Sequence, residues 1–124
     1  TLDHAPSAHW PAPVVDETVT HDRGPVLVTV EYRIEPASAA AFVTAMDALE
    51  GERRRDGAHA WGLFEDTTEP GRYLEYFLVG SWLEHQRQHE RVTRSDADLQ
   101  AVAHAFHVAP DRPVVRHFVA PVRG

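Results

Sequence analysis

The sequence predicts an α+β fold of the ferredoxin-like type, a split β-α-β arrangement that pairs with a second copy of itself. Segments that alternate apolar and polar residues are interleaved with segments of helical spacing, in the order β-α-β-β-α-β. The third predicted strand, residues 72–82, is apolar on both faces, so both faces of the sheet must be covered. Two amphipathic helices can cover only one face. We expect the same sheet of a second copy to cover the other, which gives a dimeric α/β barrel.

The first part of the chain predicts an arm, a strand and a helix. Residues 1–24 contain three prolines within the first thirteen positions and show no sustained periodicity, which is typical of a linker. Residues 26–34 alternate apolar and polar side chains and predict the first strand. Pro36 suits the first turn of the following helix, where its missing N–H costs nothing. Arginines 53–55 fall in the last turn of this helix, where the helix dipole favours cations.

The rest of the chain predicts, in order, a strand over 58–66, a strand over 72–82, a short polar helix over 83–92, a helix starting at Ser95 and a strand over 114–119. Pro70-Gly71 marks the turn between the first two of these strands. Ser95 and Asp98 have the spacing of a capping box at the start of the second amphipathic helix. The folded domain is therefore expected over residues 25–121. Its uncovered sheet face is expected to present Leu27, Trp61, Leu63 and one apolar row of the third strand.

The composition excludes several classes of function. A formal charge of −7 disfavours nucleic-acid binding, which needs a cationic surface. The chain contains no cysteine, so it has no disulfide and no thiol nucleophile. No run of 18 apolar residues is present that would span a membrane. Because the chain begins at Thr1 without an initiating Met or a signal peptide, we expect a soluble piece of a longer protein.

Two histidines on the predicted polar helix are candidates for a metal site. His85 and His89 are four residues apart and can lie on one helix face, but a catalytic metal site needs a third protein ligand. Glu90 and His59 are the only candidates for that ligand, and their spacing supports neither. The sequence therefore favours two solvated histidines, with no metal and no cofactor.

A ligand pocket between the sheet and the helices is predicted from Trp61, Tyr76, Trp82, His89 and Arg33. The same aromatic side chains could instead fill the core and the dimer interface, where large rings are commonly used. Glu75 and Arg33 lie on the third and first strands. They could form a buried charge pair, or act as an acid and the group that orients it.

Six collinear blocks of the sequence are not generic: His9-Trp10-Pro11, residues 24–33, residues 54–58, residues 71–75, residues 81–91 and Phe106-His107. Together they resemble the C-terminal soluble tail of a family of bacterial major-facilitator exporters. That family is labelled transmembrane secretion effectors and is related to the enterobactin exporter. The resemblance covers essentially the whole chain. It implies a domain at the cytoplasmic face of the inner membrane, joined in one polypeptide to a membrane transporter.

The tail itself is similar to antibiotic-biosynthesis monooxygenases, which are dimeric α/β barrels. Glu75, Trp82 and His89 resemble the Glu-x-Trp strand and following helical His of that superfamily, although six residues separate Glu75 from Trp82 here. The catalytic candidates that this resemblance implies are His89, His85, Trp82 and Glu75.

Three functions are compatible with these resemblances. The first is a non-enzymatic accessory domain of a small-molecule exporter, which dimerises and has a small aromatic compound as its candidate ligand. The second is a cofactor-independent monooxygenase acting on an aromatic or polyketide-like substrate, with His89 as the general base. The third is haem binding through His85 or His89. The first is favoured because the family resemblance implies it, and the sequence contains no complete catalytic constellation.

Overall fold

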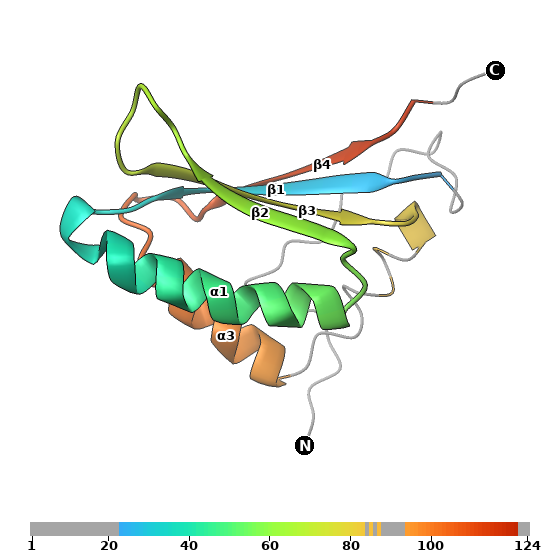
Figure 1. Ribbon diagram of the computed structural model, residues 1–124, viewed down its shortest axis with the longest axis horizontal. Helices are drawn as coiled ribbons and strands as arrows, with labels where there is room; N and C mark the ends of the chain where they lie inside the picture. The colour runs from blue at the N-terminus through green and yellow to red at the C-terminus, as the bar shows by residue number, and fades with distance from the viewer. Residues whose placement is uncertain (1–22, 84, 86, 88–93, 122–124) are drawn as a thin grey trace.

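The computed structural model describes residues 23–83, 85, 87 and 94–121 (Figure 1). Almost all of the predicted arm, residues 1–24, lies outside the described residues, as do His89 and Glu90. The described helices and strands all fall within the predicted domain range of 25–121. None of the helices that the structure describes is both long enough and apolar enough to cross a membrane.

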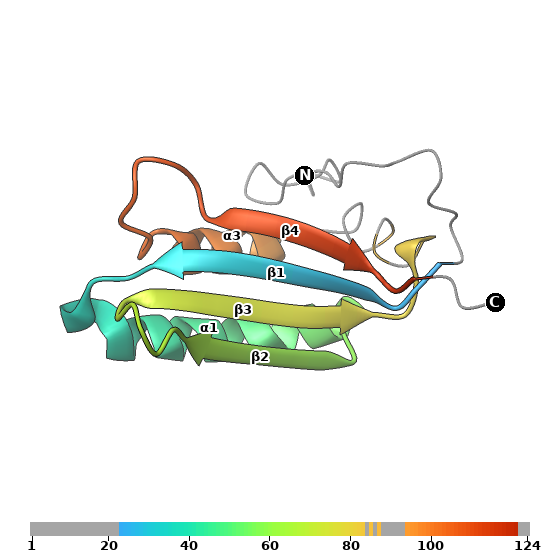
Figure 2. The same ribbon diagram turned by 90° about the horizontal axis from the view of Figure 1, so that it is seen from above.

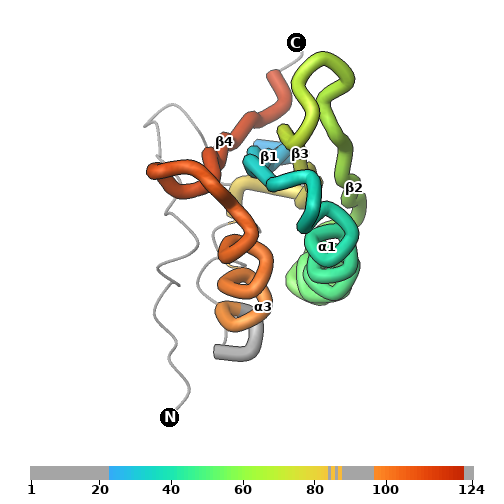
Figure 3. The backbone as a smooth tube through the Cα atoms, turned by 90° about the vertical axis from the view of Figure 1, so that its left-hand side faces the viewer, coloured from blue at the N-terminus to red at the C-terminus, as the bar shows by residue number. Residues whose placement is uncertain are grey.

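The elements follow the predicted order: β1 (Val26–Arg33), a 3₁₀ turn (Pro36–Ser38), α1 (Ala39–Arg55), β2 (Ala60–Glu65), β3 (Arg72–Val79), α3 (Arg94–His104) and β4 (Val114–Val119). The four strands form one antiparallel sheet in the order β2-β3-β1-β4 (Figure 2). Helices α1 and α3 lie side by side against one face of that sheet (Figure 3). The predicted α+β ferredoxin-like fold is confirmed.

Two predicted boundaries change in the structure, and one predicted helix is largely untested. Strand β3 ends at Val79 rather than at residue 82, because Gly80 interrupts it and Trp82 begins a helical segment. The described part of helix α3 runs from Arg94, one residue before the predicted start at Ser95. The predicted helix over residues 83–92 lies largely outside the described residues.

The core lies between the sheet and the two helices and consists of two buried clusters. The larger one contains Val30, Tyr32, Ile34, Phe42, Met46, Leu49, Tyr73 and Ala103. The smaller one contains Val26, Val28, Ala58, Phe77, Val79 and Trp82. In the larger cluster the ring of Phe42 packs edge-on against Tyr32 and Tyr73, with centroid distances of 5.1 and 5.2 Å. Such edge-to-face pairs add to the stabilisation that burial already provides.

The prediction that Trp61 and Leu63 lie on the uncovered face of the sheet is wrong. In the register of β2 and β3, Trp61 stands opposite Phe77 and Leu63 opposite Glu75, and both partners are buried beneath the helices. Trp61 and Leu63 accordingly pack against the core. Alternation along β2 shows that these two residues share a face, but it does not show which face the helices cover.

The other side of the sheet, called the open face below, carries no described helix or strand. It consists of Leu27, Thr29, Glu31, Arg33, Phe64, Arg72, Leu74, Tyr76, Leu78, Val114, Arg116 and Phe118. Leu27 was predicted to lie there and does. Several of its apolar side chains are exposed, with Phe64 60% and Phe118 49% accessible.

Candidate functional site

A carboxylate and a guanidinium meet in the buried layer between β3 and α1. Glu75 points toward the helices, and its side chain is fully buried. The Nε atom of Arg53 donates to Oε2 of Glu75 at 3.0 Å, and its Nη2 atom donates to Oε1 at 3.2 Å. The arginine is 3% exposed, and its guanidinium carbon lies 4.6 Å from the centroid of the Phe77 ring. This is a bidentate ion pair, the geometry in which arginine binds a carboxylate most strongly.

Two further donors complete the coordination of Glu75. The hydroxyl of Tyr32 donates to Oε1 at 3.0 Å, and the indole Nε1 of Trp61 donates to Oε2 at 2.9 Å. Each carboxylate oxygen therefore accepts two hydrogen bonds, which uses the acceptor capacity of the group. Burial, together with the negative charge of Glu75, raises the pKa of Tyr32 well above its usual value of 10.0. The arrangement holds a charge in the core and offers no oxygen lone pair to a substrate.

The predicted pairing of Glu75 with Arg33 is wrong. Arg33 lies on the open face, where its Nη1 is 2.7 Å from Oε1 of Glu69 and its Nη2 is 3.8 Å from Oε1 of Glu31. Glu75 stands opposite Val30 across the β1–β3 ladder and shares the buried face with it. Arg33 is three positions after Val30 on β1, and an odd offset along a strand puts two side chains on opposite faces.

Arg53 was predicted to serve only the helix dipole, and its burial was missed. The spacing of Phe42, Met46 and Leu49 defines the buried stripe of α1, and Arg53 continues this stripe four residues later. The next arginine in the run, Arg54, faces solvent and pairs with Glu50 one turn back. The signal for Arg53 was present in the helical spacing.

His85 was predicted to be solvated and is instead fully buried. Its ring centroid lies 4.9 Å from that of His117 on β4 and 5.9 Å from that of Trp82. The backbone N–H of Trp82 donates to the carbonyl of Arg23 at 2.7 Å, which places the cluster where the arm enters the domain. In the part of the chain that the structure describes, no three His, Cys, Asp or Glu side chains gather as metal ligands.

Of the five residues predicted to line a ligand pocket, the four that the structure describes are divided between the two sides of the sheet. Trp61 and Trp82 face the helices and pack against the core clusters. Tyr76 and Arg33 lie on the open face, since Tyr76 stands opposite Thr29 and stacks on Phe64 at 5.9 Å. His89, the fifth residue and the predicted general base, lies outside the described residues.

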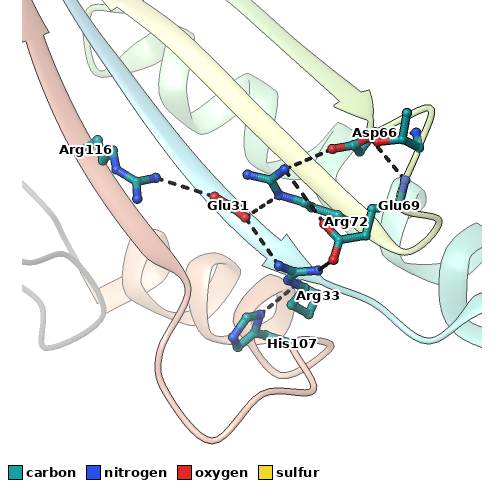
Figure 4. Close-up of polar contacts among 8 residues, drawn as sticks. Glu31, Arg33, Asp66, Glu69, Arg72, His107 and Arg116 are labelled. Atoms are coloured by element: carbon teal, nitrogen blue, oxygen red, sulfur yellow. Dashed lines mark hydrogen bonds and ion pairs between the residues drawn. The ribbon is translucent and has the colours of Figure 1, made fainter.

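A network of charged side chains occupies one end of the open face (Figure 4). Glu31 lies at its centre: Arg72 Nε donates to Oε1 at 2.5 Å, and Arg116 Nη1 donates to Oε2 at 3.4 Å. Arg72 also reaches Asp66 on the β2–β3 hairpin, with 2.9 Å between Nη1 and Oδ2. These contacts raise the pKa of Arg72, and the hydrogen bond from Arg72 lowers the pKa of Glu31.

Acid is expected to weaken the fold in part through Glu31. Because the pKa of Glu31 is lowered from 4.5 in the folded chain, the unfolded chain binds this proton more readily. The stability due to Glu31 is therefore fully present above about pH 4.5 and is lost as the pH falls through the lowered pKa. Urea unfolding at neutral pH and at about pH 3.5 is expected to show a smaller acid-induced loss for Glu31→Gln than for the wild type. Equal losses in both proteins would contradict this role.

Solved structures of other proteins share this fold. A "putative antibiotic biosynthesis monooxygenase" from Caulobacter crescentus CB15 is 21% identical with a TM-score of 0.67, covering 82% of this chain and 94% of that one. A protein of the same description from Bordetella bronchiseptica is 16% identical with a TM-score of 0.66, covering 81% and 100%. One from Nitrosomonas europaea is 13% identical with a TM-score of 0.60, covering 82% and 93%. The domain therefore has the fold of the antibiotic biosynthesis monooxygenases.

Family membership is given by a match of residues 1–123 to the family described as transmembrane secretion effector. The chain belongs to that family. No curated protein is similar enough to count as a match.

Proposed function

We propose that this chain is a non-enzymatic accessory domain of a major-facilitator-type small-molecule exporter, and that it acts as a homodimer paired through the open face. The observation that carries the pairing is the exposed apolar surface of the sheet. Phe64, Leu74, Val114 and Phe118 are between 40% and 60% exposed, and all four lie on the open face. Large apolar side chains that are exposed together on one sheet face are typical of an interaction site.

The charges of the open face also suit self-association. The chain as a whole carries −7, which makes two copies repel each other. The network at the end of the open face contains three arginines and three carboxylates, namely Arg33, Arg72, Arg116, Glu31, Asp66 and Glu69, so its formal charge sums to zero. The network therefore adds no net charge to the repulsion between two copies, and the flanking apolar residues supply the attraction.

The accessory role is supported by the hydrogen bonds of Glu75 in the core. Glu75 is the only acidic side chain among the catalytic candidates, and Arg53, Tyr32 and Trp61 occupy both of its oxygens. A general base must be within hydrogen-bond reach of the proton that it removes. A carboxylate that is fully buried and already accepts four hydrogen bonds is better suited to stabilising the fold.

The mass of the chain in solution tests the pairing. At micromolar concentration, light scattering is expected to give twice the 13.9 kDa mass of one chain. A monomer mass throughout the micromolar range would overturn the dimer. The exporter assignment is tested separately by the coding sequence upstream of Thr1, which is expected to encode the apolar segments of a transporter.

A second candidate function is that of a cofactor-independent monooxygenase. It is favoured by the fold shared with proteins whose descriptions name an antibiotic biosynthesis monooxygenase. Oxygen consumption in the presence of anthrone-like or quinol substrates would support this function. The accessory role predicts no consumption above the rate without protein. Haem binding through His85 or His89 stays a prediction, which a Soret band on haem titration would support.

A further inference from the structure

A pocket of about 430 Å³ opens between the C-terminal end of α3, the connection that follows it and the start of β4. Its volume is within the range of pockets that bind small molecules. Most of its wall is made of small apolar side chains: Ala101, Ala105, Ala109, Pro110, Pro113 and Val115. The pocket lies on the helix side of the sheet and is separate from the open face, since Val115 packs against the core.

The polar groups of the pocket wall are mainly hydrogen-bond donors. They are His104, His107 and Arg112, with Asp111 as the single carboxylate. The Nδ1 atom of His107 accepts a hydrogen bond from the backbone N–H of Arg33 at 2.9 Å (Figure 4). An Nδ1 atom that accepts is unprotonated, so the ring proton of His107 is on Nε2. This Nε2–H is buried and has no acceptor among the described residues.

An N–H group buried without an acceptor is costly, because it has lost its hydrogen bonds to water. His107 lines the pocket, and a ligand atom with a lone pair can supply the missing acceptor once a small shift of the ring brings the buried Nε2 to the pocket surface. The positive charge of Arg112 favours an anionic acceptor over a neutral one. The apolar wall favours a ligand whose remaining surface is a hydrocarbon ring.

The pocket is held in place by backbone contacts between distant parts of the chain. His107 forms a β-bridge with Ile34, and the N–H of Val108 donates to the carbonyl of Arg33 at 2.8 Å. The ring of His104 packs edge-on against Tyr32 with 5.6 Å between centroids, and Tyr32 is bonded in turn to Glu75. The backbone at His107 and the ring of His104 are therefore held by the end of β1 and by the core before a ligand arrives, which reduces the entropy lost on binding.

We propose that this pocket binds a small aromatic carboxylate, with its ring against the alanine and proline wall and its carboxylate at His107 and Arg112. The pocket gives the proposed accessory domain a class of ligand. The biological role of this ligand rests on the proposed function. It does not depend on pairing, because none of its residues belongs to the open face.

The test is a titration of the ¹⁵N-labelled chain with salicylate, followed by amide NMR. Saturable shifts are expected at Ala101, Ala105 and Ala109, with a dissociation constant of roughly 0.1–1 mM, as suits a ligand of this size. Benzyl alcohol has a similar ring but no carboxylate, and is expected to bind at least about tenfold more weakly. Shifts that fail to saturate, or equal binding of both compounds, would overturn the proposal.

Two variants locate the site. His107→Asn retains a side-chain oxygen that can accept from the Arg33 N–H but removes the Nε2 donor, and is expected to weaken salicylate binding at least about tenfold. Ala101→Leu narrows the pocket and is expected to do the same, whereas Ala48→Leu makes the identical change on the exposed side of α1 and is expected to bind like the wild type. Thermal melting checks that each variant is folded.

The outcomes for the pocket and for the dimer can be told apart. If His107→Asn and Ala101→Leu are both folded and bind salicylate like the wild type, the ligand lies elsewhere and the proposal is wrong. A dimer that binds no aromatic acid refutes the pocket and leaves the pairing intact. A monomer that binds salicylate at Ala101 and Ala105 refutes the pairing and leaves the pocket intact.

Discussion

Replacing Arg53 by methionine is expected to lower the free energy of unfolding by about 3–5 kcal/mol, because it leaves a buried carboxylate without its counter-charge. Glu75 is fully buried and would retain only the hydroxyl of Tyr32 and the indole N–H of Trp61 as donors. Methionine fills a comparable volume beside Phe77, so the loss reflects charge rather than packing. Urea unfolding at a fixed chain concentration, followed by circular dichroism, measures the effect.

The neighbouring arginine provides a matched control for this prediction. Arg54→Met makes the same change one residue further along α1, where the arginine is exposed and pairs with Glu50. That pair is expected to contribute less than about 1 kcal/mol, as exposed ion pairs do. Equal destabilisation by Arg53→Met and Arg54→Met would show that the buried pair has no special role.

A combined variant separates the ion pair from the rest of the core. Arg53→Met with Glu75→Leu and Tyr32→Phe removes both charges and the Tyr32 hydroxyl, and leaves the part-buried indole N–H of Trp61 as the one group that loses its acceptor. Buried ion pairs replaced by apolar side chains of similar volume are often as stable as the original or more so. We therefore expect the triple variant to be more stable than Arg53→Met alone. If the triple variant lost as much free energy of unfolding as the three single variants together, the uncompensated charge would not be the cause of the destabilisation.

Alternation along β1 accounts for most of what the sequence predicts about the fold. Val28 and Val30 are buried under the helices, whereas Leu27 and Thr29 between and beside them face the other way. The same two-sided pattern in β3 predicts a sheet with two faces to cover. Alternation has period two in any strand, so the two faces are distinguished without knowledge of the tertiary structure.

The buried ion pair could also have been predicted, and the reason it was missed is physical. Glu75 occupies a place in the apolar row of β3 between Tyr73 and Phe77, and Arg53 continues the apolar stripe of α1 after Leu49. Three arginines at the end of a helix already have an explanation in the helix dipole. Because that explanation applies to all three arginines, it gives no reason to single out Arg53, which points into the core.

The pocket beside α3 has no counterpart in any local pattern of the sequence. Its donor, His107, is oriented by the N–H of Arg33, which lies 74 residues earlier in the chain. Likewise, the buried ring of His85 contacts His117, which lies 32 residues later in the chain. Hydrophobic periodicity reports which side of an element is buried, but it does not report which two elements meet.

Replacing Phe118 by glutamate is expected to convert the dimer into a monomer. Phe118 is 49% exposed in the single chain and stands opposite Leu27 on the open face, so the fold of one copy depends little on it. In the proposed pair, each copy would have to bury a carboxylate without a partner, which costs several kcal/mol. The dissociation constant is expected to rise at least about a hundredfold, a change of about 2.8 kcal/mol. Sedimentation velocity over the micromolar range measures this shift.

Two comparisons show whether the loss comes from burial at the open face. Val102→Glu places the same charge on α3 at a side chain that is 54% exposed, and this variant is expected to keep the mass of the wild type. Phe118→Lys reverses the sign of the new charge, so it reduces the general repulsion between two chains of charge −7 but has the same cost of burial. If lysine dissociates the pair as glutamate does, desolvation at the open face is the cause. If lysine leaves the dimer intact and only glutamate dissociates it, net charge is the cause and the position of Phe118 in the interface is not supported.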